Sequence, residues 1–262
     1  MMDLGLKDKV ALVTGGSSGI GRATALAFAA EGAKVAVVGR DAERLRQVVA
    51  ALQAIESQGF ALRADLSLLD EAKRVAIETA THFGRIDILV NSAGSAMGGS
   101  FLEIADQQWL DAMQLKFFGA VRLSRQVVPH MIQAGGGRII NIIGGAAKEP
   151  SPTFLPGAAT NAALRNFNKG LALALKPYNI LVNAISPGST RTPRVVRLME
   201  QEAKLRGISL EEVEKEREAE AVGGHMTTPE EIAAVAVFLA SQQVMTLTGT
   251  EIDVNGGTSR GL

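Results

Sequence analysis

The stretch Thr14-Gly15-Gly16-Ser17-Ser18-Gly19-Ile20-Gly21 decides the fold predicted for this chain of 262 residues. It follows an apolar run at 10–13 and precedes a helical pattern at 23–30. In such a strand–loop–helix unit, glycines permit a tight turn, close approach of the backbone to a phosphate, and close packing of helix on strand. The helix N-terminus adds free N–H groups and partial positive charge. We therefore predict a dinucleotide-phosphate site built from Gly15, Ser17, Ser18, Gly19, Ile20 and Gly21.

The rest of the chain alternates apolar strand patterns with helical patterns. Strands are predicted at 10–13, 34–38, 60–63, 86–90, 138–143, 181–185 and 251–254, and helices at 23–30, 42–57, 70–83, 106–134, 155–175 and 230–240. Strands that are apolar throughout and separated by helices indicate a parallel sheet covered on both faces. Right-handed crossovers then give a Rossmann-type, doubly wound α/β fold. We see no linker or repeat, so the prediction is a single dinucleotide-binding domain over 1–262.

One segment departs from this dense pattern. Residues 200–220 are rich in charge, most of all Glu211-Glu212-Val213-Glu214-Lys215-Glu216-Arg217-Glu218. Such a run is typical of a solvated helix with ion pairs four residues apart. The alternative is a substrate flap over 190–225, because ligands of doubly wound sheets bind beyond the carboxyl ends of the strands.

Composition narrows the classes of function. The 27 basic residues balance the 27 acidic ones, so no global field favours nucleic acid or an anionic membrane. There is no cysteine, which excludes disulfides and thiol catalysis and agrees with a cytoplasmic location. No apolar run reaches the ~20 residues of a membrane span. No histidine or acidic cluster has metal-ligand spacing, so we predict no metal site.

The end of the second predicted strand bears on which dinucleotide would bind. Sites for NAD place an acidic residue there to hold the ribose 2′-hydroxyl. This chain has Gly39 followed by Arg40. Glycine removes a repelling carboxylate, and arginine can pair with a 2′-phosphate. The residues favour NADP(H) over NAD(H), although Arg40 could instead pair with Asp41 or Glu43.

Several motifs together resemble the short-chain dehydrogenase/reductase family over nearly the whole chain. They are the glycine loop, Ala64-Asp65-Leu66, Val90-Asn91-Ser92-Ala93-Gly94, Asn183-Ala184-Ile185-Ser186-Pro187-Gly188, Thr228-Pro229-Glu230-Glu231, and Thr248-Gly249 with Asn255-Gly256-Gly257. The resemblance implies a seven-stranded parallel sheet, a small-molecule substrate, and a homo-oligomer, often a tetramer. It also implies cofactor contacts at Asp65, Leu66, Asn91, Ala93, Gly94, Pro187, Gly188, Thr190 and Thr192.

The same resemblance sets an expectation for catalysis that this chain does not meet. Members of the family use asparagine, serine, tyrosine and lysine, the tyrosine as acid/base and the lysine to lower its pKa and hold the nicotinamide ribose. Spacing from the neighbouring motifs assigns these four places to Lys116, Gly144, Gly157 and Asn161. A shifted alignment does not restore the set, because the only tyrosine is Tyr178 and the residue four beyond it is Val182.

Two hypotheses follow from these replacements. Asparagine and lysine are exchanged, so Lys116 can keep a positive charge near the nicotinamide ribose, where it would support cofactor binding or act electrostatically. Lys116 and Asn161 are therefore the tentative catalytic residues. The missing side chain at Gly157 would leave an open space beside the nicotinamide unless Phe154 or its neighbours fill it.

Three functions remain open at this point. The first is an NADP(H)-dependent oxidoreductase with non-standard acid/base chemistry on a carbonyl or alcohol. The second is a catalytically inactive dinucleotide-binding sensor or partner subunit. The third is a non-redox reaction in the same cleft.

Overall fold

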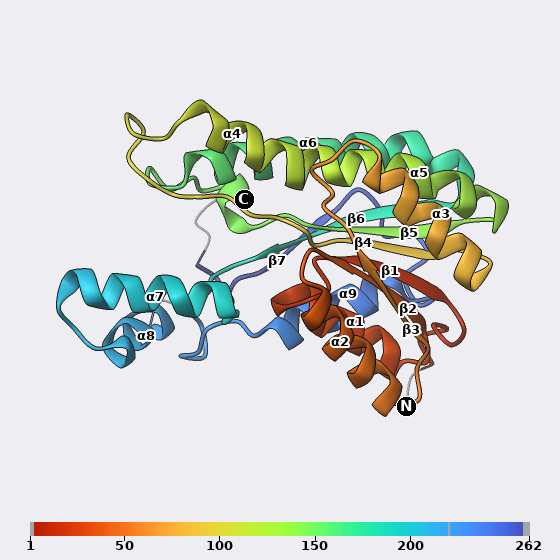
Figure 1. Ribbon diagram of the computed structural model, residues 1–262, viewed down its shortest axis with the longest axis horizontal. Coiled ribbons are helices and arrows are strands. Elements are labelled where there is room, and N and C mark those ends of the chain that lie inside the picture. The colour runs from red at the N-terminus through yellow and green to blue at the C-terminus, as the bar shows by residue number, and fades with distance from the viewer. Residues whose placement is uncertain (1–2, 220, 259–262) are drawn as a thin grey trace.

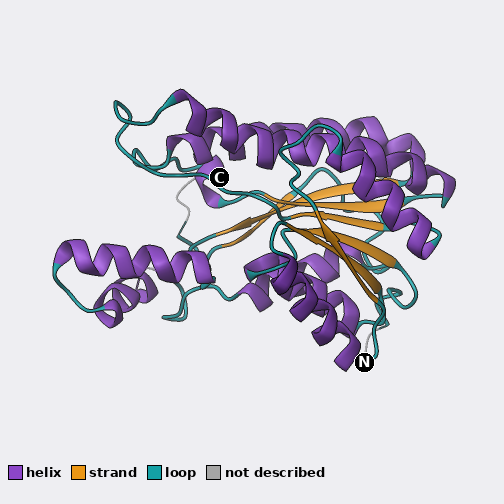
Figure 2. Ribbon diagram, in the orientation of Figure 1, coloured by secondary structure: helices purple, strands orange, loops and turns teal. Residues whose placement is uncertain are grey.

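Seven parallel strands form one sheet in the order β3-β2-β1-β4-β5-β6-β7 (Figures 1 and 2). The computed structural model describes residues 3–219 and 221–258. The strands are β1 (Val10–Thr14), β2 (Lys34–Gly39), β3 (Gly59–Arg63), β4 (Ile88–Asn91), β5 (Gly137–Ile142), β6 (Ile180–Pro187) and β7 (Glu251–Val254). The predicted doubly wound fold is confirmed, and each predicted strand is present with its ends shifted by at most two residues.

Helices cover both faces of the sheet. One face carries α1 (Gly19–Ala30), α2 (Ala42–Ala54) and α9 (Pro229–Ala240), and the other carries α3 (Glu71–Phe83), α4 (Asp106–Ala112), α5 (Gly119–Gln133) and α6 (Leu155–Leu175). Apolar side chains fill both layers, with Phe28 and Val37 buried on the first side and Leu89 and Val127 on the second. This burial on both faces explains why the strands read as continuous apolar runs.

The helix predicted over 106–134 is not regular. A π-helical segment at Met113–Phe118 joins α4 to α5. A π turn takes one residue more than an α turn, and such segments are frequent at functional sites. Short 3₁₀ turns lie at Gly145–Ala147 and Lys176–Tyr178.

The charged segment forms two helices, α7 (Pro193–Arg206) and α8 (Leu210–Ala219), which project beyond the carboxyl ends of the strands (Figure 1). They enclose a small core of their own, made by Met199, Ala203, Val213 and Met226. Ion pairs four residues apart are present on their exposed sides, as in Lys215–Glu211 at 2.7 Å. The solvated-helix interpretation is therefore confirmed for α8, and the position of α7 bears on the cleft described below.

Candidate functional site

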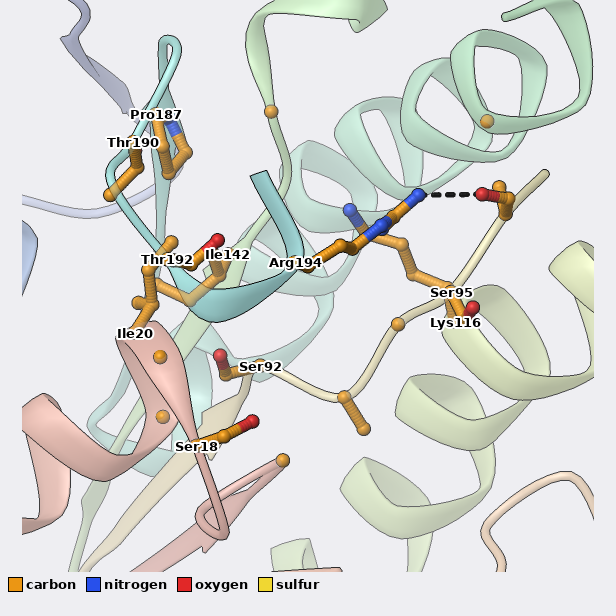
Figure 3. A pocket seen from close by; sticks show the side chains of 18 of the residues that line it. Ser18, Ile20, Ser92, Ser95, Lys116, Ile142, Pro187, Thr190, Thr192 and Arg194 are labelled. Atoms are coloured by element: carbon orange, nitrogen blue, oxygen red, sulfur yellow. Dashed lines mark hydrogen bonds between the residues drawn. The ribbon is translucent and has the colours of Figure 1, made fainter. Parts of the chain in front are cut away.

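A cleft of about 660 Å³ lies at the carboxyl end of the sheet, where the strand order reverses between β1 and β4 (Figure 3). Doubly wound sheets bind ligands at this switch point. Its walls come from the loops after β1, β4, β5 and β6 and from the start of α7. The predicted site residues that line it are Gly15, Ser17, Ser18, Gly19, Ile20, Gly21, Arg40, Leu66, Ala93, Gly94, Lys116, Gly144, Gly157, Asn161, Pro187, Gly188, Thr190 and Thr192.

Within the glycine loop, the backbones of Gly15 and Gly21 lie against each other. A Cβ atom on Gly21 would lie 2.3 Å from the carbonyl oxygen of Gly15, so no side chain fits there. Gly15 and Gly19 have φ values of 66° and 53°, which favour glycine. Ser18 occupies the N-cap position of α1 without a side-chain capping bond. The N–H groups of the first turn are thus available for an anionic ligand.

Thr14, at the end of β1, fixes this loop against the neighbouring one. Its hydroxyl accepts hydrogen bonds from the backbone N–H groups of Ser92 (2.9 Å) and Ala93 (3.0 Å) and donates to the carbonyl of Val90. The side chain therefore ties the two loops that diverge at the switch point. Sequence reasoning included Thr14 in the motif but gave it no role.

Two predicted cofactor residues do not line the cleft. The Asn91 amide lies beneath it, donating to Asn141 at 2.9 Å, and Asn141 donates in turn to Asn168 at 2.8 Å. This buried chain joins β4, β5 and α6. The Asp65 carboxylate accepts bonds from the backbone and hydroxyl of Ser67, at 3.0 and 2.7 Å. Both residues support the wall behind the cleft.

Arg40 marks the far end of the cleft, together with Arg44. The Arg40 guanidinium lies 3.9 Å from Asp65, and its side chain is 65% exposed. It pairs with neither Asp41 nor Glu43, the alternatives considered from sequence. Asp41 instead caps α2, accepting from the N–H groups of Glu43 and Arg44. Arg40 therefore has only a long contact with Asp65 at this end of the cleft, and its side chain remains accessible to a ligand.

Lys116 enters the opposite end of the cleft from the π-helical segment. Its ammonium group donates a hydrogen bond to the carbonyl of Ile143, just beyond β5. The methylene chain lies against Gly94, where a Cβ atom would meet Lys116 Cδ at 3.0 Å. Lys116 therefore spans from its helix to the end of the central strands, beneath the start of α7.

Burial and, to a smaller extent, the positive charge of Arg194 together lower the pKa of Lys116 to about 7. Desolvation and a like charge both penalise an ammonium ion. Ser95 and Asn161 are uncharged neighbours in the same wall, and no carboxylate among the described residues lines the cleft. Lys116 consequently exchanges its proton near neutral pH.

Gly144 and Asn161 face each other across the cleft wall. Gly144 has a φ of 117°, which residues other than glycine rarely adopt. A Cβ atom on Gly144 would lie 3.1 Å from Asn161 Nδ2. Asn161 is 5% exposed, and its Oδ1 atom has no hydrogen-bond partner among the residues that the structure describes. A buried amide oxygen without a donor is costly, which suits a group that receives a ligand hydroxyl.

The space at Gly157 is filled. A Cβ atom there would lie 2.1 Å from Cζ of Phe154, whose ring covers the glycine. The alternative in which this position opens a pocket is therefore wrong. Phe154 instead becomes part of the cleft wall.

The first turn of α7 closes the cleft from above. A Cβ atom on Gly19 would meet Thr192 Cγ2 at 3.1 Å, so this turn lies directly over the glycine loop. Arg194 crosses the cleft, donating from Nη2 to the carbonyl of Ala96 at 2.5 Å, and Figure 3 shows its side chain beside Lys116. Arg194 and Arg197 also line the cleft, and sequence reasoning missed both because they read as ordinary surface charges on a helix.

The lowered pKa of Lys116 predicts how stability varies with pH. The unfolded chain titrates this lysine near 10.4, so between about pH 7 and 10 the unfolded state binds more protons and stability rises with pH. Below about pH 7 the folded state must bury the charge, and the full penalty applies. Lys116→Met should therefore be more stable than the parent in thermal unfolding at pH 6–7, with the difference narrowing towards pH 10. A difference independent of pH would contradict the titration.

The described residues offer neither a cluster of metal ligands nor a helix that could span a membrane. No group of three or more histidine, aspartate or glutamate side chains is arranged to hold a metal ion. No helix within residues 3–219 and 221–258 has the length and apolarity needed to cross a bilayer.

Comparison with known proteins places this architecture in a family. The family model described as short chain dehydrogenase matches residues 9–203. An uncharacterized oxidoreductase of Bacillus subtilis, YvrD, is 37% identical over the full length of both chains. The 3-oxoacyl-[acyl-carrier-protein] reductase FabG of Thermotoga maritima is 33% identical, covering 96% of this chain and 98% of the relative.

Solved structures agree with the sequence relatives. The L-sorbose reductase of Gluconobacter frateurii, crystallised with NADPH and L-sorbose, superposes with a TM-score of 0.96 at 34% identity and full coverage of both chains. An actinorhodin polyketide ketoreductase with NADPH gives a TM-score of 0.92 at 30% identity, covering 97% of this chain and 98% of that chain. With the sheet order, the cleft at the switch point and these relatives in agreement, the chain belongs to the short-chain dehydrogenase/reductase family of oxidoreductases.

Proposed function

We propose that the protein is an NADP(H)-dependent reductase of carbonyl compounds in which Lys116, rather than a tyrosine, supplies the proton. The observation that carries this proposal is the position of Lys116, whose ammonium group reaches the end of β5 in the dinucleotide cleft and has a pKa of about 7. An effective acid has a pKa near the working pH. The L-sorbose reductase and the ketoreductase found by comparison both carry NADPH, which supports the cofactor assignment.

The residues of the cleft fit a dinucleotide. The contact between Gly15 and Gly21, where no Cβ atom fits, holds the start of α1 close against the loop, and that start offers unbonded N–H groups to a pyrophosphate. Thr190 and Thr192 lie in the segment after β6 that the family resemblance assigns to the nicotinamide carboxamide, and Thr192 also covers Gly19. Leu66 and Ala93 would contact the adenosine half, with Asp65 and Asn91 holding the backbone behind them, whereas Gly94 lies against the Lys116 side chain.

Arg40 supports NADP(H) over NAD(H), because Gly39 before it carries no carboxylate and its guanidinium is exposed at the mouth. We expect Arg40→Ala to weaken NADPH binding by about 10- to 100-fold, the equivalent of one charge-assisted contact. Binding of NADH should change little. The measurement is calorimetric titration of both nucleotides. Arg46→Ala is the matched control, since Arg46 lies on α2 and pairs with Glu43 on the exposed side. Equal losses for both nucleotides would argue against a 2′-phosphate contact.

Bound NADPH would supply the hydride that the carbonyl carbon receives. Lys116, in its ammonium form, donates a proton to the carbonyl oxygen and becomes a neutral amine, then regains a proton from solvent. The buried Oδ1 atom of Asn161, which has no hydrogen-bond partner among the described residues, would accept a hydrogen bond from a hydroxyl of the nicotinamide ribose. In this scheme Lys116 and Asn161 divide the work that the family resemblance assigns to tyrosine and lysine.

The assignment of Gly144 and Gly157 to the family's serine and tyrosine places rests on motif spacing, and the surroundings support it. Neither residue brings a hydroxyl to the cleft, and the Phe154 ring is apolar. An acid must then come from another wall. Lys116 lines the cleft and has a pKa lowered to about 7, so it can serve as that acid.

A non-catalytic dinucleotide-binding protein is the second candidate, and the lack of serine and tyrosine hydroxyls favours it. A panel of ketones, aldehydes and alcohols assayed with NADPH or NADP⁺ separates the two candidates. Turnover supports the reductase. Tight NADPH binding without turnover across the panel supports the binding protein, and absence of nucleotide binding overturns both.

A further inference from the structure

The charge of the cleft is one-sided. Five basic residues and no acidic residue stand among the described residues that line it, namely Arg40, Arg44, Lys116, Arg194 and Arg197. The chain as a whole is neutral, with 27 basic and 27 acidic residues. A cleft lined by one sign of charge concentrates ligands of the opposite sign.

The two ends of the cleft are charged for different reasons. Arg40 and Arg44 stand at the adenosine end, and both are close to carboxylates, Arg40 3.9 Å from Asp65 and Arg44 3.2 Å from Asp41. This end is accounted for by the proposed 2′-phosphate. Lys116, Arg194 and Arg197 form a second group, in which the charge of Arg194 acts on Lys116 and that of Arg197 acts on Arg194.

Other arginines of α7 and its flanks have acidic partners. Arg206 binds Glu202 at 3.0 Å and Glu216 at 2.6 Å, and Arg191 binds Glu214 at 3.0 Å. By contrast, Arg194 and Arg197 form no ion pair with any residue in the described part of the chain. The segment is rich in glutamate, yet none of its described glutamates lines the cleft.

The Arg194 side chain is held in place although it lacks a counter-ion. Its guanidinium passes beside the Lys116 side chain and donates to the carbonyl of Ala96 across the cleft (Figure 3). Desolvation and the charge of Arg197 lower the pKa of Arg194, and Arg194 lowers the pKa of Lys116. The structure therefore keeps three like charges together at an energetic cost, which an anion would relieve.

The pyrophosphate of the cofactor does not explain this cluster. The pyrophosphate would lie on the start of α1, beneath Thr192, which covers Gly19. The Arg194 side chain runs from there towards the loop after β4 and away from α1. An anion bound by Arg194 beside Lys116 would therefore belong to the substrate.

We propose that the substrate is a carbonyl compound with its own anionic group, a carboxylate or a phosphate, which Arg194 holds with help from Arg197 while the carbonyl oxygen faces Lys116. This inference rests on the proposed reductase function and specifies its substrate class. An anion on Arg194 offsets the charge that disfavours a protonated Lys116. Substrate binding therefore favours the ammonium form of Lys116 and draws a proton from solvent. The anionic group of the substrate thus raises the fraction of Lys116 that can donate a proton.

The experiment uses the NADP⁺ complex of the full chain, in which the ketone probes cannot be reduced, and matched pairs of probes. The carboxylate pair is 4-oxopentanoate with its methyl ester, and the phosphate pair is dihydroxyacetone phosphate with dihydroxyacetone. Calorimetry at pH 8 in two buffers of different ionisation enthalpy measures affinity and proton uptake together. At least one anion should bind ten-fold or more tightly than its neutral partner, with net proton uptake. Comparing the two pairs distinguishes carboxylate from phosphate.

Variants assign the effect to a residue. Arg194→Met should abolish the preference for the anion and leave NADPH affinity within about two-fold of the parent. Lys204→Met is the matched control on α7, because Lys204 is exposed and does not line the cleft. Thermal unfolding verifies that each variant folds.

Three outcomes would overturn the proposal. Neutral probes could bind as well as their anionic partners, anions could bind without dependence on Arg194, or Arg194→Met could lose NADPH and probe affinity alike. None of these three outcomes contradicts the proposed reductase function, provided that the parent protein still binds NADPH and reduces carbonyl compounds. A parent protein that fails to bind NADPH would instead overturn the proposed function.

Discussion

Replacing Lys116 with methionine is expected to lower kcat for carbonyl reduction by about 10²- to 10⁴-fold, the usual contribution of a positioned acid. Methionine keeps the length and much of the apolar stem of the side chain, so contacts with Gly94 should survive. Because the ammonium is the active form in reduction, the parent rate should fall as pH rises through the pKa of Lys116, about 7 in the free protein and higher with an anion bound. Steady-state rates from pH 5.5 to 9.5 measure both effects.

The variant should lose that pH dependence along with the rate. NADPH affinity, measured separately, distinguishes the two roles considered for Lys116. A large fall in affinity with an unchanged kcat would mean that Lys116 holds the cofactor and that the proton comes from elsewhere. An unchanged rate and an unchanged affinity would remove Lys116 from the site altogether.

A Gly21→Ala substitution is expected to weaken NADPH binding by at least 100-fold. The new methyl group would sit 2.3 Å from the Gly15 carbonyl oxygen and 2.6 Å from its carbon, both backbone atoms that cannot rotate away. Either α1 shifts from β1 or the glycine loop deforms, and both changes disturb the phosphate cradle. Forced overpacking of this kind costs about 1–3 kcal/mol of stability. Nucleotide calorimetry and urea unfolding measure the two effects.

Gly170→Ala is the matched control for this substitution. Gly170 lies in α6, and a Cβ atom there would have no neighbour within 4 Å. Removing a glycine from a helix interior should stabilise the protein by about 0.5–1 kcal/mol and leave nucleotide binding unchanged. Parent-like NADPH affinity in Gly21→Ala would mean that the cradle is not the pyrophosphate site.

The sheet was predictable from sequence because its central strands, such as β1 and β4, are buried on both faces and read as apolar runs. The helix Leu155–Leu175 was predicted to the residue, since it starts near Pro156 and is followed by Pro177. The strand at 251–254 was predicted from its pattern, whereas the order of the strands in the sheet required the three-dimensional structure. The π-helical segment at Met113–Phe118 could not be foreseen, because one extra residue in a turn leaves the hydrophobic pattern almost unchanged.

The cofactor half of the candidate site was largely predictable, and the substrate half was not. Glycine motifs are local, so Gly15 and Gly21 could be placed from the chain alone. The pairing of Lys116 with Arg194 joins residues 78 positions apart (194 minus 116) and depends on how α7 lies over the cleft. Arg194 reads as one more charge in a charged segment, and only its lack of an acidic partner distinguishes it from Arg206.

The contact between Phe154 and Gly157 also required three-dimensional structure. From sequence, Phe154 was one of several neighbours that could fill the missing side chain's place. The structure has its ring within 2.1 Å of where a Cβ atom would be. Replacing Gly157 with tyrosine alone would therefore introduce a clash, and a substitution at Gly144 would be strained because its φ is 117°.

The Phe154 ring couples positions 154 and 157. A tyrosine introduced at position 157 would require the ring to move aside, and removing Phe154 alone would uncover the glycine in the cleft wall. The effects of substitutions at these two positions should therefore not be additive.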